Sequence, residues 1–104
     1  MSKKYEIRVL PSADADMDSL EQYIEEQCSA PLTAARQFQR LYQLFDWIAE
    51  YAALPAVDVD LSIQYGKIMR NIRFGKKMTI IYSIEEDIVY IHRIMPQSMI
   101  TYSE

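Results

Sequence analysis

Apolar residues recur at helical spacing twice in the first half of the chain, and this pattern constrains the fold more than any other feature. The first stripe consists of Ala13, Met17, Leu20, Ile24 and Cys28, and the second of Ala34, Phe38, Leu41, Phe45, Ile48 and Ala52. Gaps of three and four residues are typical of helices with one buried face. Since Ser29-Ala30-Pro31 separates the two stripes, we expect a helical hairpin whose apolar faces must be covered by the rest of the chain.

Short alternating segments supply that cover. Residues 4–9 alternate apolar and polar side chains, and three similar runs follow at 67–74, 78–84 and 88–94. Short loops at 75–77 and 85–87 make these last three strands antiparallel neighbours. Residues 56–65 also alternate, which predicts extended chain, either a strand or an extended loop. The expected fold class is α+β, with an N-terminal strand, a helical hairpin and a C-terminal antiparallel sheet that has helices on one face and the other face open.

The size and charge of the chain narrow the functional classes. Its 104 residues fit one domain over residues 1–104. The net charge of −4 argues against a free-standing nucleic-acid binder, because phosphate contacts need a basic surface. The charge is uneven, since residues 1–66 hold five Lys/Arg and eleven Asp/Glu, whereas residues 67–104 hold six and four. Cys28 is the single cysteine, which excludes an intrachain disulfide and suits a cytoplasmic location.

No metal, cofactor or membrane segment is expected. His92 is the single histidine, and no second His, Cys or carboxylate stands at ligand spacing from it. Asp14, Asp16 and Asp18 have the spacing of a calcium loop, but the glycine and the later glutamate of such a loop are missing, so they fit acids at a helix start. No apolar run approaches the roughly 18 residues that a membrane helix needs.

An ordered set of motifs resembles the RelE/ParE toxin superfamily. The motifs are Pro11-Ser12-Ala13, Asp18 to Ile24, Pro31 through Leu54-Pro55, Gly66 with Arg70 and Arg73, and Ile80-Ile81-Tyr82 followed by residues 86–94. Together they cover almost the whole chain. The resemblance implies a plasmid-stabilisation type of toxin from a type II toxin–antitoxin pair, held inactive by a cognate antitoxin through which it could form oligomers.

The superfamily contains two activities with different chemical needs. RelE-like members cut mRNA on the ribosome, and ParE-like members inhibit DNA gyrase without being nucleases. RNA cleavage needs a base, an acid and cations around the phosphate. The candidate phosphate- or target-binding cations are Lys67, Arg70, Arg73, Lys76, Lys77 and Arg93. The candidate catalytic residues are Arg73, His92 and Tyr102, with Arg73 the best single candidate for function.

Departures from the superfamily pattern favour the ParE-like alternative. Thr79 stands where an arginine is usual, and Met69 and Asn71 stand about where RelE-like nucleases carry lysines. Met95-Pro96 replaces a histidine that often follows the last strand. We therefore predict a toxin that acts by protein binding, with DNA gyrase as the candidate target. The alternatives are a ribosome-dependent mRNA endoribonuclease and a family member that has lost toxicity and only binds its antitoxin.

Overall fold

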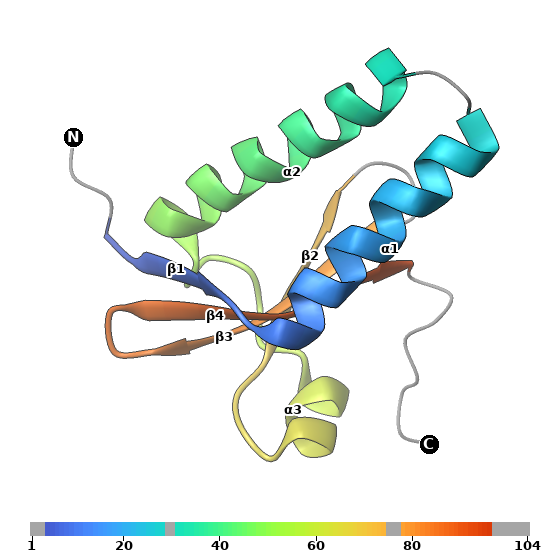
Figure 1. Cartoon of the computed structure of the whole chain (residues 1–104). Coiled ribbons are helices and arrows are strands. Elements are labelled where there is room, and N and C mark those ends of the chain that lie inside the picture. Colours follow the sequence, from blue (N-terminus) through green and yellow to red (C-terminus); the bar gives the residue numbers. More distant parts are fainter. Residues whose placement is uncertain (1–3, 29–30, 75–77, 97–104) are drawn as a thin grey trace.

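The structure is a computed structural model, and it describes residues 4–28, 31–74 and 78–96. Within these residues the chain forms helices and strands in a β-α-α-α-β-β-β order (Figure 1). The elements are β1 (Glu6–Val9), α1 (Pro11–Cys28), α2 (Pro31–Tyr51), α3 (Val59–Tyr65), β2 (Arg70–Phe74), β3 (Met78–Glu85) and β4 (Ile88–Pro96). The predicted α+β class, with an N-terminal strand, two long helices and a C-terminal sheet, is confirmed.

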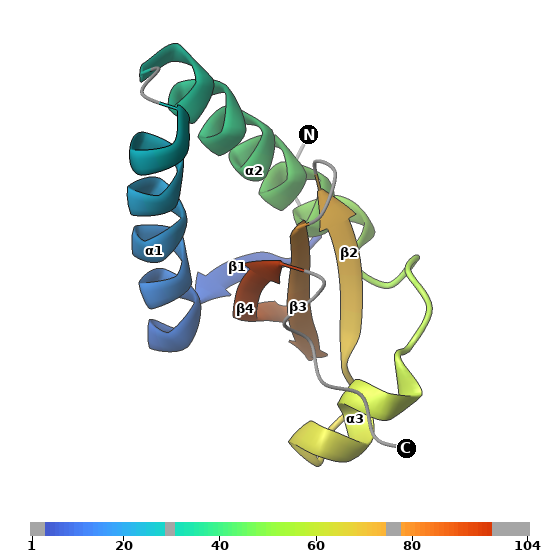
Figure 2. The same cartoon turned by 90° about the vertical axis from the view of Figure 1, so that its right-hand side faces the viewer.

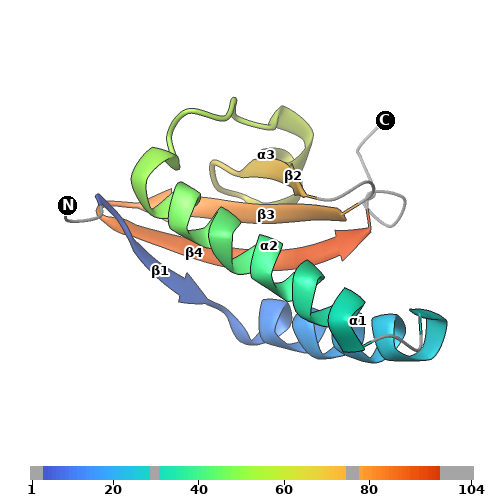
Figure 3. The same ribbon diagram turned by 90° about the horizontal axis from the view of Figure 1, so that it is seen from above.

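The four strands form one mixed sheet in the order β1-β4-β3-β2. The β2, β3 and β4 strands are antiparallel neighbours, as expected from their short loops. The β1 strand lies parallel to β4 and forms one edge of the sheet. Seen from above, α2 lies across the strands and α1 continues beyond the end of β1 (Figure 3).

The main core lies between the sheet and the α1–α2 hairpin. Leu41 and Ile48 of α2, Ala52 directly after it and Ala13 of α1 are buried against the sheet, as the helical stripes predicted. The opposing strand residues of this cluster are Ile80, Tyr82, Val89, Ile91 and Ile94. The Tyr82 hydroxyl donates to the carbonyl of Ala52 over 2.8 Å, and burial raises its pKa to about 12. A buried hydroxyl thus keeps a hydrogen-bond partner at the end of α2.

The prediction for residues 56–65 was wrong, because this segment contains the helix α3 instead of a strand or a long loop. Asp58 caps its start by accepting from the backbone N–H of Leu61 over 3.0 Å. Gly66 ends it in the left-handed conformation at φ 70°, which glycine adopts without strain. Leu61 is buried, whereas Val59 and Ile63 are about two-thirds exposed. The apparent alternation therefore came from a short helix that buries one apolar face and exposes another.

The sheet face opposite the hairpin is also less open than predicted. The α3 helix lies on that side (Figure 2), and its Leu61 forms a second buried cluster with Met69 and Ile81. Tyr65 and Met95 pack against the same cluster. Thr79 and Ser83 of β3 are buried as well. The second half of the chain thus covers part of its own sheet.

Candidate functional site

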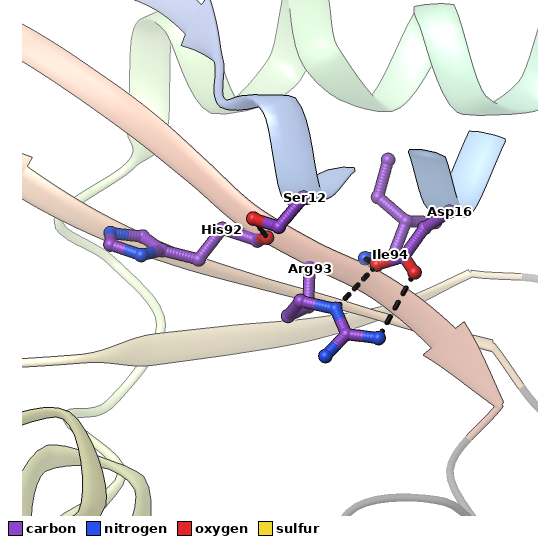
Figure 4. Close-up of polar contacts among 5 residues, drawn as sticks. All are labelled: Ser12, Asp16, His92, Arg93 and Ile94. Carbon is purple, nitrogen blue, oxygen red and sulfur yellow. Dashed lines mark hydrogen bonds and ion pairs between the residues drawn. The ribbon is translucent and has the colours of Figure 1, made fainter. Parts of the chain in front are cut away.

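A β-bulge in β4 determines where the candidate residues near the end of the chain point. The β3–β4 register pairs Ile81 with Arg93 but Tyr82 with Ile91, so His92 is an extra residue in β4. Ile91 and Ile94 both remain in the main core as a result. Bulges re-aim side chains in this way without breaking the sheet. His92 and Arg93 therefore both lie outside the main core (Figure 4).

The first turns of α1 complete the edge of β4 beyond the point where β1 ends. The last ladder contact is the N–H of Leu10, which donates to the carbonyl of Ile91 over 3.0 Å. The Ser12 hydroxyl then donates to the carbonyl of His92 over 2.6 Å. Further along β4, the Asp16 carboxylate accepts a hydrogen bond from the backbone N–H of Ile94 over 2.9 Å (Figure 4). Side chains of a helix thus replace the missing strand at this edge.

Asp16 also binds Arg93, one of the predicted cations. The guanidinium Nε and Nη2 atoms donate to the two carboxylate oxygens over 2.7 and 3.0 Å. These hydrogen bonds raise the pKa of Arg93. A fork of this kind uses the arginine donors that a phosphate would otherwise bind. Arg93 therefore joins α1 to β4 in this structure.

His92 lies on the α3 side of the sheet and contacts both layers. Its Nε2 is 2.8 Å from the Ser83 hydroxyl, and its ring meets the ring of Tyr65 edge-on at 5.5 Å. Burial lowers the pKa of His92, Lys67 lowers it further, and Glu85 opposes them. Ser83 is only 1% exposed, so its hydroxyl is covered, whereas His92 is partly exposed. The contacts support a structural role between α3 and the sheet.

The other predicted cations are not gathered into one site. Lys67 pairs with Glu85 over 3.6 Å, and the Arg70 Nε donates to the carbonyl of Pro55 over 3.0 Å. Arg73 is exposed, and its side chain forms no hydrogen bond or ion pair with the residues that the structure describes. Lys76, Lys77 and Tyr102 lie outside the described residues.

The residues that replace the usual cations serve packing and capping. Met69 is fully buried in the α3 cluster, and Thr79 is fully buried in β3. The Asn71 amide donates to Asp58 over 2.7 Å, which braces the start of α3. This part of the sheet face is therefore occupied by a short helix and its supports, and the described residues there form no set of converging cations.

A groove that the sequence reasoning missed runs beside the free edge of β1, between α1 and α2. It has a volume of about 660 Å³. Its described lining consists of Tyr5, Glu6, Ile7, Val9, Asp14, Met17, Tyr42, Phe45, Asp46 and Ala49. Three of these are acidic and none is Lys or Arg, although Glu6 pairs with the neighbouring Arg8 over 2.6 Å. The groove depends on long-range contacts, such as the Tyr5 N–H that donates to the carbonyl of Ala49 in α2 over 2.8 Å, so no local sequence signal could reveal it.

Two further findings concern metal ions and membranes. Across residues 4–28, 31–74 and 78–96 there is no group of three or more His, Cys, Asp or Glu side chains arranged to hold a metal ion. The helices in the same ranges are too short or too polar to cross a membrane.

Comparisons with known proteins agree on a family. A family model described as the ParE toxin of the type II toxin–antitoxin system parDE matches residues 7–101. A solved structure described as the chromosomal ParDE TA system from P. aeruginosa is similar in fold, with a TM-score of 0.70 and 14% sequence identity. The match covers 91% of this chain and 98% of the other. No curated protein matches the chain.

Proposed function

We propose, since the chain belongs to the ParE toxin family of type II toxin–antitoxin systems, that it arrests bacterial growth by binding a protein target and that a cognate antitoxin neutralises it. DNA gyrase is the first candidate target, because ParE-like members of the superfamily act on it. The lone cysteine fits a cytoplasmic site of action, where such a target would be met.

The observation that carries this proposal is that most of the candidate cations already bind other groups of the fold. Arg93 is held by Asp16, Arg70 by a backbone carbonyl, and Lys67 lies beside Glu85. Cleavage of RNA needs cations that converge on the scissile phosphate and an accessible acid and base. Among the described residues, Arg73 alone of the predicted cations has no such partner. This arrangement favours protein binding over an mRNA endoribonuclease.

The groove beside β1 supports the antitoxin part of the proposal. Its apolar walls include Met17, Tyr42 and Phe45, and Tyr42 is 54% exposed. Asp14 and Asp46 add negative charge to the lining. A segment with apolar side chains flanked by Lys or Arg is complementary to this chemistry. We propose that the antitoxin presents such a segment and folds it into the groove.

The decisive experiment is induced expression in a bacterial host that lacks the antitoxin. We expect growth arrest with filamentation and DNA damage, while reporter mRNA stays intact by primer extension. Supercoiling assays with purified gyrase then test the candidate target directly. Coexpression of the antitoxin should restore growth.

Three outcomes would contradict parts of the proposal. Rapid cleavage of mRNA at the onset of arrest would establish the nuclease alternative. Arrest with intact mRNA and unaffected gyrase would assign a different protein target. Normal growth, with soluble folded protein present, would favour the alternative of a family member that only binds its antitoxin.

A further inference from the structure

The outer edge of β1 carries backbone groups that have no partner in the sheet. The β1 strand pairs with β4 on one side only and forms one edge of the sheet. The backbone N–H groups of Glu6 and Leu10 both donate to carbonyls on the β4 side, over 2.8 and 3.0 Å. Because backbone groups alternate in direction along a strand, Ile7 and Val9 direct their N–H and C=O groups away from β4. No hydrogen bond joins these groups to the residues that the structure describes.

The unpaired part of this edge is short and has defined ends. Before β1, the N–H of Tyr5 points to the same side as that of Ile7, and it donates to the carbonyl of Ala49 in α2 over 2.8 Å. At the other end, α1 begins at Pro11. Between these limits Ile7 and Val9 offer two donors and two acceptors, which suit a partner strand of roughly three to five residues.

The groove beside β1 reaches this edge. Its lining includes Ile7 and Val9, whose side chains pack toward the main core, and also Glu6, which lies on the other face of the strand. Lining residues from both faces of one strand mean that the groove extends to the edge between them. Figure 3 shows β1 at the border of the sheet with no strand beyond it. A segment in the groove therefore meets the unpaired backbone groups.

These backbone groups select the conformation of the occupant. Ile7 and Val9 are half-buried, so a partner that covers their N–H and C=O groups without bonding them leaves polar groups unsatisfied. A helix uses its own backbone groups internally, whereas an extended peptide has them free to pair with a sheet edge. The charge at the edge is mixed, because Lys4 and Arg8 lie on either side of Glu6 along the chain. The backbone, more than the charge, thus distinguishes a strand from a helix.

We propose that the antitoxin occupies the groove through an extended segment that adds to the free edge of β1 as a fifth strand of the sheet. Every second side chain of this segment faces the hairpin, where Met17, Tyr42 and Phe45 supply apolar contacts. The side chains between them face the other side of the sheet. This inference rests on the proposed function, since it states how the proposed antitoxin is bound.

The first test measures the protection of backbone amides in the wild-type protein. Its probe is the antitoxin that restores growth on coexpression, and amide hydrogen exchange is followed residue by residue by NMR. In the free toxin, the amides of Glu6 and Leu10 should be protected, whereas those of Ile7 and Val9 should exchange rapidly. In the complex, exchange at Ile7 and Val9 should slow about tenfold or more, because both N–H groups gain an acceptor.

The second test compares Ile7→Pro with Ile7→Ala. Both substitutions shorten the same half-buried side chain, so the two variants should have similar melting temperatures. Proline also removes an N–H that faces away from β4 and places its ring at the edge, where it blocks a further strand. The Ile7→Pro variant should therefore bind the antitoxin about tenfold or more weakly than Ile7→Ala in titration calorimetry. If Ile7→Pro fails to fold, the exchange experiment decides alone.

The remaining outcomes each overturn the inference. If the Ile7 and Val9 amides exchange as rapidly in the complex as in the free toxin, or if the two folded variants bind equally, the antitoxin does not pair with β1, while the proposed function stands. If no coexpressed protein restores growth, the antitoxin part of the proposed function fails and the inference fails with it. If the free toxin sediments as a dimer with both amides protected, a second copy of the chain occupies the edge.

Discussion

At the scale of single residues, the protonation of His92 should make the stability of the fold depend on pH. Burial beside Ser83 and the charge of Lys67 lower the pKa of His92 in the folded state, so the unfolded chain binds a proton more readily. Stability is therefore fully present above the unfolded pKa of about 6.5 and is lost as the pH falls from there toward the folded pKa. Urea denaturation at a series of pH values should show this decline. The His92→Gln variant should lack it, and parallel curves for both proteins would contradict the explanation.

Glu86 carries local backbone strain in the turn between β3 and β4. Its φ is +58°, a conformation that costs most L-residues roughly 1–2 kcal/mol. Glycine relieves this cost but makes the unfolded chain more flexible. The Glu86→Gly variant should gain about 0.5–1 kcal/mol of unfolding free energy. The neighbouring Asp87→Gly variant serves as the control and should lose stability, because Asp87 does not have a positive φ.

Arg73 tests the residue-level prediction made from the sequence. Its side chain is exposed and makes no hydrogen bond or ion pair with the described residues, so the Arg73→Ala variant should change the melting temperature little. If Arg73 contacts the target, growth arrest should weaken at matched expression. Unchanged arrest would remove Arg73 from the target surface. Arg70→Ala is a useful contrast, because loss of its bond to Pro55 should affect stability as well.

At the scale of elements, Asp16 holds α1 against the bulged edge of β4. In the Asp16→Ala variant, the Arg93 guanidinium and the backbone N–H of Ile94 lose their hydrogen-bond acceptor. An unsatisfied backbone group and a broken charged hydrogen bond should together cost roughly 1–3 kcal/mol. Thermal and urea unfolding measure this loss. Asp18→Ala, at an exposed position of the same helix, should stay within about 0.5 kcal/mol of the wild type.

The elements also show which sequence patterns were reliable. The stripes of α1 and α2 run over several turns, and a long period is hard to mistake for another structure. Residues 56–65 are too short to establish a period, so alternation at Val59, Leu61 and Ile63 suggested extended chain, either a strand or an extended loop. The end signals at Asp58 and Gly66 favoured a helix, and they carried more information than the apolar pattern.

At the scale of the whole molecule, the candidate site depended on contacts that the sequence does not reveal. Arg93 looked available for phosphate because its partner Asp16 lies 77 residues away along the chain. The bulge at His92 changed which side chains of β4 share a face of the sheet. A prediction based on strict alternation of side chains cannot anticipate such a bulge. The groove depends on β1 lying against α2, where the Tyr5 N–H donates to the carbonyl of Ala49, and these residues lie far apart along the chain. The fold class could be predicted from local periods, whereas the binding surfaces arise from long-range packing.

The net charge of the molecule gives a test of how an antitoxin would approach it. The chain carries −4 overall, and the described lining of the groove includes Asp14 and Asp46 without any Lys or Arg. Charge of one sign around a concave surface accelerates the approach of an oppositely charged partner, and salt screens this effect. Between about 0.05 and 0.5 M salt, the association rate constant of the antitoxin should fall about tenfold or more, while the dissociation rate changes much less. Stopped-flow or surface-binding kinetics provide both rates. Asp14→Asn should reduce the salt dependence, whereas Asp60→Asn, in α3 on the opposite side of the sheet (Figure 2), should not. A salt-independent association rate would mean that the acidic lining does not guide the partner into the groove.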